Sequence, residues 1–126
     1  YTKAQIFSTM IGEGCVAYLP STKITTEEGV ALLKQAQATI ILAHPVLLKK
    51  NNYQELIALG MDGLEAIYPA NTPEDTKRFK RFALSHNLIY TAGSDFHSFD
   101  DQKHGNIGSS VLEKEALTAF LKKVME

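Results

Sequence analysis

An acid and a histidine stand two residues apart in the segment Gly93-Ser94-Asp95-Phe96-His97. In an extended chain, side chains alternate between two faces, so Asp95 and His97 would point to the same side. A carboxylate and an imidazole held together can bind a divalent metal ion or act as an acid–base pair. The alternative is a capping Asp and a surface His in a loop, and a D-x-H triplet is too short to decide between these interpretations.

His44 is a further candidate for the same chemistry. It follows the apolar run 38–43 and precedes Pro45, which cannot continue a β-ladder. Taken alone, a histidine in this position is more often a loop residue than a ligand. Its significance therefore depends on whether it lies near Asp95 and His97.

The elements that must position these residues are short strands and helices. The apolar runs 38–43, 63–68 and 88–92 have the length and composition of buried strands. The first of them is apolar on both faces, which is typical of a parallel strand covered on each side. Helical spacing of apolar residues predicts helices that begin at Lys3, Thr25, Tyr53, Thr72 and Glu113, the last one ending at Met125.

Local residues predict both the ends of these helices and their buried faces. The residues suited to satisfy free backbone groups at helix ends are Thr25 with Glu28, Thr72 with Pro73, Asn51 or Asn52, Gly60 and Asn87. The apolar stripes expected to face the core are Val30 and Leu33; Phe79, Phe82 and Ala83; and Leu117, Phe120, Leu121 and Val124.

Strands that alternate with helices predict an α/β fold of parallel βα units. The carboxyl ends of parallel strands meet at one edge, which would carry His44, Tyr68 with Asn71, and Asp95 with His97. Strands lie about 4.8 Å apart, so strand ends two places apart are roughly 10 Å apart, a span that metal ions with bound phosphate could bridge. Three ligands are too few for a closed metal site, and three strands are too few for a barrel. Further ligands and strands are therefore expected from elsewhere.

Composition excludes several other classes of protein. The formal charge is −1, from 13 basic and 14 acidic residues, so there is no overall basic field to attract nucleic acid non-specifically. The single cysteine, Cys15, excludes an internal disulfide and favours a cytoplasmic setting. No apolar run approaches about 18 residues, so no membrane partner is expected.

Three motifs, Ala43-His44-Pro45, Gly63-Leu64-Glu65 and Gly93-Ser94-Asp95-Phe96-His97, resemble the C-terminal half of the polymerase-and-histidinol-phosphatase (PHP) superfamily. The closest likeness is to its stand-alone phosphoesterases, which act on small nucleotides and RNA ends. The resemblance implies a distorted barrel of seven parallel strands with helices outside. Residues 21–126 would form the C-terminal half of this domain, and residues 1–20 the end of an inserted segment and a connector.

The resemblance also implies two or three divalent metal ions, manganese, iron or zinc, at the carboxyl ends of the strands. His44, Asp95 and His97 would be metal ligands and catalytic residues. The family takes other ligands from an N-terminal H-x-H pair, which this sequence lacks. We therefore expect the chain to be a fragment with little or no activity by itself. The intact enzyme would hydrolyse phosphate esters of nucleotides or of RNA or DNA ends through metal-bound water.

Residues near the same edge are candidates for contact with the substrate. They are Tyr68, Asn71, His104 and Asn106, for which packing, helix capping or a glycine turn are the structural alternatives. Relatives often have a basic or aromatic residue after the A-H-P motif, where this chain has Val46 and Leu47. Strand alternation sets Glu65 opposite Leu64, which leaves open a barrel-facing, an outer-face or a buried structural role.

Other functions remain open at this point. Within the family, the alternatives are a histidinol-phosphatase-like or a polymerase-associated module. Outside it, the alternative is a βα module that binds a partner without metal. Open sheet edges can also pair with a second copy, so a homodimer is one expected state.

Overall fold

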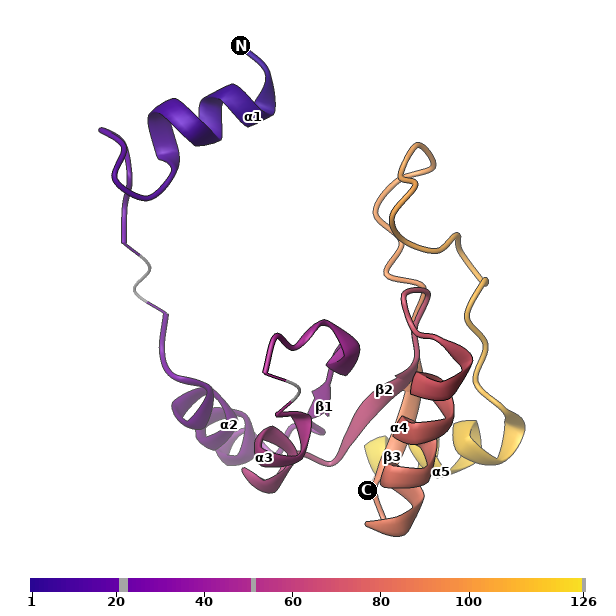
Figure 1. Ribbon diagram of the computed structural model, residues 1–126. Coiled ribbons are helices and arrows are strands. Elements are labelled where there is room, and N and C mark those ends of the chain that lie inside the picture. Colours follow the sequence, from indigo (N-terminus) through magenta and orange to yellow (C-terminus); the bar gives the residue numbers. More distant parts are fainter. Residues whose placement is uncertain (21–22, 51, 126) are drawn as a thin grey trace.

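The computed structural model describes residues 1–20, 23–50 and 52–125. Its centre is a parallel sheet of three strands, β1 (Ile41–Leu42), β2 (Gly63–Ile67) and β3 (Ile89–Ala92), in the order β1-β2-β3 (Figure 1). Helices connect consecutive strands, so the prediction of an α/β fold with parallel βα units is confirmed. The described residues contain this one sheet and do not show a seven-stranded barrel.

Four helices and one 3-10 turn surround the sheet. Their bounds are α2 (Thr26–Gln35), η2 (Pro45–Leu47), α3 (Tyr53–Ala58), α4 (Pro73–Ser85) and α5 (Lys114–Met125). Helix α4 packs on β2 and β3, helix α5 packs on β3, and helix α3 lies against β1 (Figure 1). Because the three strands run parallel, their carboxyl ends lie along one edge.

The hydrophobic core lies between the sheet and helices α3 and α4. Leu64 and Ala66 on β2 are fully buried and share this cluster with Tyr53, Phe79 and Ala83. The rings of Tyr53 and Phe79 meet edge to face, with centroids 5.2 Å apart, an arrangement that aromatic pairs prefer. The predicted apolar stripe of the helix that begins after Thr72 is thus confirmed.

Several helix ends form as the residues predict. Thr25 and Glu28 form a capping box, in which Thr25 Oγ1 accepts the Glu28 N–H at 3.1 Å. Gly60 adopts φ 102° just after α3, a left-handed conformation that glycine takes without steric penalty. Of the two predicted caps, Asn51 or Asn52, Asn52 occupies the N-cap position of α3, but its side chain makes no capping hydrogen bond. Asn51 lies outside the described residues.

The outer faces of α2 and α5 differ from the prediction. Val30 is buried as expected, but Leu33 is 46% exposed. On α5 the buried residue is Ala116, whereas Leu117, Leu121 and Val124 are exposed. An amphipathic pattern identifies which side of a helix is apolar, but it does not supply a partner. No layer covers these faces within the part of the chain that the structure describes.

The first residues form a separate helical segment. Helix α1 (Lys3–Ile6) continues into a π-helical turn, η1 (Phe7–Ile11), which ends at Gly12. Figure 1 shows this segment reaching away from the sheet. The boundary between residues 1–20 and 21–126 stays a prediction. Among the described helices, none combines the length and the apolar character needed to cross a membrane.

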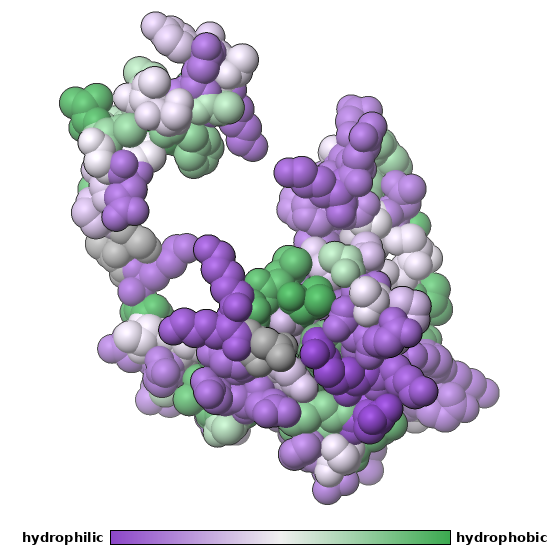
Figure 2. Space-filling model, viewed as in Figure 1, coloured by the Kyte–Doolittle hydropathy of each residue, from purple (hydrophilic) through white to green (hydrophobic). Residues whose placement is uncertain are grey.

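The surface around the carboxyl edge is mixed in character. Figure 2 shows hydrophilic surface over the loop that follows β3 and hydrophobic surface over η2. Leu47 in η2 is exposed, whereas Val46 packs against the core. The segment after Pro45 therefore places an exposed apolar side chain, that of Leu47, near the edge where the candidate residues gather.

Candidate metal centre

The candidate ligands lie where the strands end. His44 follows β1, Tyr68 follows β2, and Asp95 follows β3 after Gly93 and Ser94. Because the strands are parallel and adjacent in the order β1-β2-β3, these residues share one edge. The topology therefore converts three distant sequence positions into one cluster.

Asp95 and His97 come together, but not by the predicted route. Asp95 has φ 52°, so the chain turns through the left-handed region there and is not extended. The turn brings His97 Nδ1 to 2.6 Å from the Asp95 carbonyl oxygen and to 3.6 Å from Asp95 Oδ1. Aspartate tolerates this conformation better than most residues, although it still strains the backbone.

His44 also adopts a left-handed conformation, with φ 39°. Its Nε2 lies 4.0 Å from Asp95 Oδ2, and its ring packs beside that of Tyr68 with centroids 5.1 Å apart. The structure thus brings His44, Asp95 and His97 to the same edge of the sheet. Their role as ligands is taken up below as a proposal.

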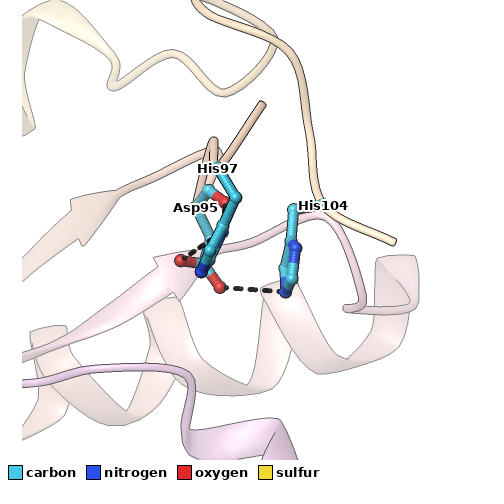
Figure 3. Close-up of side chains that lie close together, drawn as sticks. All are labelled: Asp95, His97 and His104. Carbon is cyan, nitrogen blue, oxygen red and sulfur yellow. Dashed lines mark hydrogen bonds and ion pairs between the residues drawn. The ribbon is translucent and has the colours of Figure 1, made fainter. Parts of the chain in front are cut away.

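His104 joins this cluster from the loop after β3. Its Nε2 lies 3.4 Å from Asp95 Oδ2, and its ring stacks on His97 with centroids 4.2 Å apart. Asp95, His97 and His104 each offer a ligand atom, and these atoms lie within 4.8 Å of one another. Figure 3 shows the Asp95 carboxylate beside the two stacked imidazoles, with a contact to each ring. Sequence reasoning placed His104 among substrate contacts and missed this geometry.

Asp101 fixes the orientation of His104. Asp101 Oδ2 lies 2.5 Å from His104 Nδ1, and this hydrogen bond, together with the Lys103 N–H, holds the pKa of Asp101 below its usual range. The contact leaves His104 Nε2 facing Asp95. A carboxylate behind a histidine is the usual support of a metal-binding imidazole. The D-x-x-H spacing from Asp101 to His104 was the available sequence signal.

Tyr68 contacts Asp95 from the neighbouring strand. Its hydroxyl donates a hydrogen bond to Asp95 Oδ2 at 3.2 Å. Burial raises the pKa of Tyr68, and the bond to Asp95 raises it further, so the phenol stays protonated and remains a donor. Tyr68 therefore supports a candidate ligand, and a contact with substrate stays a prediction.

Glu65 links the strand ends behind the cluster. Its Oε2 accepts the His44 N–H at 3.0 Å. Burial raises the pKa of Glu65; the His44 N–H and ring oppose this effect, and the charge of Asp95 adds to it. A Cβ atom built on Gly93 would lie 2.2 Å from Glu65 Oε1, so the carboxylate sits directly against the end of β3.

Asn71 and Asn106, also predicted as substrate contacts, have structural surroundings. Asn71 Nδ2 donates to the Ala66 carbonyl oxygen at 2.8 Å, while its buried Oδ1 has no hydrogen-bond partner among the described residues. Asn106 is exposed, and its carbonyl oxygen accepts the Ser109 N–H in a turn. Their contact with a substrate stays a prediction.

The donor set suits a divalent transition metal. One carboxylate and several imidazoles are the groups that zinc, iron and manganese accept in proteins. Asp95 lies within 4.0 Å of the imidazole nitrogens of His44, His97 and His104. An imidazole binds a metal ion in its neutral form, so the charge that would balance the Asp95 carboxylate in such a site is that of the cation.

Comparison with known proteins points to the same chemistry. No family model and no curated protein matches the sequence. A solved structure from Bifidobacterium adolescentis, provisionally described as a metal-dependent phosphoesterase, is 26% identical with a TM-score of 0.68, covering 99% of this chain and 46% of that one. An amidohydrolase from Chromobacterium violaceum, solved with bound sulfate and no metal, is 22% identical with a TM-score of 0.56, covering 82% of this chain and 38% of that one.

The second likeness concerns the fold alone, whereas the first extends over nearly the whole chain. This chain spans less than half the length of either solved protein. Its α/β fold and its Asp–His cluster are consistent with the similarity to the phosphoesterase. The chain therefore shares its fold with a portion of a metal-dependent hydrolase.

Proposed function

We propose that this chain is part of a metal-dependent phosphoesterase of the polymerase-and-histidinol-phosphatase superfamily. The observation that carries the proposal is the meeting of His44, Asp95 and His97 at one edge of the sheet, with His104 beside them. The similarity to the Bifidobacterium protein supports it. The substrates would be phosphate esters of nucleotides or of RNA or DNA ends.

Each residue of the cluster has a proposed task. His44, Asp95, His97 and His104 would hold two or three divalent ions, manganese, iron or zinc, together with ligands from outside this chain. Bound metal supplies a hydroxide at neutral pH and neutralises charge on the phosphate oxygens. Tyr68 would hold the Asp95 carboxylate in its orientation through the hydrogen bond that its hydroxyl donates to Oδ2.

The remaining features of the proposal concern the intact protein. The chain alone would bind metal weakly and turn over little substrate, because most of the family's ligands lie outside it. The complete domain would be a seven-stranded barrel, in which residues 1–20 end an inserted segment and residues 21–126 supply the C-terminal half. We propose a cytoplasmic location, and a homodimer through open sheet edges for the isolated chain.

Thermal unfolding with added metal tests the site. We expect MnCl₂ or ZnCl₂ to raise the Tm of the chain, because a ligand that binds only the folded state stabilises it. Asp95→Ala should remove this rise, whereas the control Asp100→Ala, at an exposed carboxylate of the same loop, should keep it. If neither metal raises the Tm of the wild-type chain and Asp95→Ala behaves like the wild type, a βα binding module without metal is favoured. Rapid hydrolysis of a nucleotide bisphosphate by this chain alone would contradict the proposed ligand set.

A further inference from the structure

Glu65 contacts the chain just beyond the ends of both neighbouring strands. It lies on β2, accepts the backbone N–H of His44 beyond β1, and touches the backbone position of Gly93 beyond β3. The pairing of β2 with β3 also shifts register between Glu65 and Ile67. Irregularities of this kind re-aim side chains and are common beside active sites.

The bond to Glu65 fixes an unusual backbone. His44 has φ 39° and ψ 56°, a left-handed conformation that a histidine adopts only when its surroundings enforce it. Strand β1 has already ended at Leu42, so no ladder bond holds the His44 N–H. In the described part of the chain, Glu65 is its acceptor.

We propose that Glu65 is the positioning residue of this site, holding His44 through its main chain so that the imidazole faces Asp95. The inference rests on the proposed metal site for its effect on metal binding, but not for its effect on His44 itself. Glu65 is not a member of the Asp95, His97 and His104 group, and its hydrogen bond is to the His44 main chain, so the proposed role acts through His44.

The proposed role requires a side chain at position 65 that is long enough to reach the His44 N–H and that carries an acceptor oxygen. A glutamine has the same length and keeps an oxygen that accepts the His44 N–H. An alanine has no acceptor and leaves the N–H unpaired. Gly93 provides an independent way to disturb the contact, because a methyl group there would collide with Glu65 Oε1 while leaving the carboxylate in the chain.

Asp62 offers a matched control on the same strand connection. Its Oδ2 accepts the Ile40 N–H at 2.9 Å, just before β1 and β2 begin. Asp62 and Glu65 therefore make the same type of bond to the main chain at opposite ends of β1. Asp62→Ala should remove such a bond without touching the candidate ligands.

Two measurements on the full chain test the proposal. The first is hydrogen exchange of the His44 amide by NMR in metal-free protein. We expect faster exchange in Glu65→Ala and Gly93→Ala, and near wild-type protection in Glu65→Gln and Asp62→Ala. The second is Zn²⁺ or Mn²⁺ affinity by calorimetry. We expect about a 10- to 100-fold loss in Glu65→Ala, the usual effect of removing a partner behind a metal ligand, with recovery in Glu65→Gln.

The possible results separate the two proposals. Unchanged His44 exchange in both Glu65→Ala and Gly93→Ala would overturn the positioning role, as would an equal metal-affinity loss in Asp62→Ala and Glu65→Ala. If the wild type binds no metal while His44 still loses protection in Glu65→Ala, the positioning role stands and the proposed function fails. If Glu65→Ala does not fold, Gly93→Ala compared with Glu65→Gln decides the question.

Discussion

Two carboxylates, one just before strand β2 and one in its middle, make the same type of bond in opposite electrostatic surroundings. Asp62, just before β2, accepts the Ile40 N–H, and Glu65, on β2, accepts the His44 N–H. At Asp62 burial raises the pKa, but the Ile40 N–H and the nearby Lys123 outweigh it, so the pKa lies below its usual range. At Glu65 burial prevails and the pKa is raised.

The same contrast appears in the backbone. Of the four described non-glycine residues with positive φ, Gln37 and Asn87 follow the C-terminal ends of α2 and α4, where a left-handed residue is an ordinary helix stop. The other two are His44 and Asp95, which follow strands. The amino-terminal edge of the sheet thus has compensated charge and routine strain. The carboxyl edge has its strain at the candidate ligands His44 and Asp95 and carries two carboxylates, Asp95 and Glu65, whose like charges interact, which is typical of functional sites.

The largest expected difference between the two edges is in metal binding. Asp95→Asn should lower the affinity for Zn²⁺ or Mn²⁺ more than about 100-fold, because losing even a supporting partner costs about 10- to 100-fold. Asp62→Asn should leave the affinity at the wild-type value. Calorimetric titration of both variants makes the comparison, and equal losses would mean that the two edges do not differ in this way.

A supporting residue should have a smaller effect. Asp101→Asn should weaken metal binding by about 10-fold or more, because the hydrogen bond to His104 Nδ1 becomes weaker and the ring is less firmly oriented. Asp100→Asn changes the adjacent, exposed residue and is the matched control. If both variants bind metal equally well, His104 does not belong to the metal site.

At the amino-terminal edge, substitution should lower the stability of the fold and leave metal binding unchanged. Asp62→Ala leaves the Ile40 N–H without its acceptor and removes the 3.0 Å ion pair with Lys123. The free energy of unfolding should fall by about 1–3 kcal/mol, the range for an unsatisfied buried donor. Urea denaturation of metal-free protein measures it. A change within experimental error would show that water replaces Asp62 at no loss.

Much of the fold could be predicted because its signals are local. A threonine followed three residues later by an acid caps α2 and α4, as predicted for Thr25, and apolar runs mark the strands. The order of strands then follows from short connections, which usually place consecutive strands side by side. These rules are sufficient to predict that His44 and Asp95 lie at a common edge of the sheet.

The remaining features depend on contacts that no local pattern specifies. The path of the loop that brings His104 to Asp95 has no periodicity. Alternation placed Glu65 on the face opposite Leu64, but it could not show what that face contacts. The exposure of Leu117 likewise depends on which surfaces are available to cover it. The left-handed turn at Asp95 was missed because an extended chain was assumed beyond the strand.

The smallest expected effect is on the pH dependence of stability. The pKa of Asp62 is lowered in the folded protein from an ordinary value of 3.8, so the unfolded chain takes up the proton first as the pH falls. The stability due to Asp62 is therefore fully present above that value and is lost as the pH falls through the lowered folded pKa. Asp62→Asn has no charge at this position to lose. The difference in unfolding free energy between the wild type and this variant, the Asp62→Asn deficit, should therefore shrink as the pH falls.

Urea unfolding of metal-free wild type and Asp62→Asn between neutral pH and about pH 3 measures this difference, because the other acids titrate in both proteins and cancel. Lys123→Met removes the nearest cation, so the Asp62→Asn deficit should depend less on pH in that background. A deficit that stays constant with pH in the wild-type background would mean that the charge of Asp62 adds nothing to its hydrogen bond. The two edges of the sheet would then differ in their candidate ligands but not in their electrostatics.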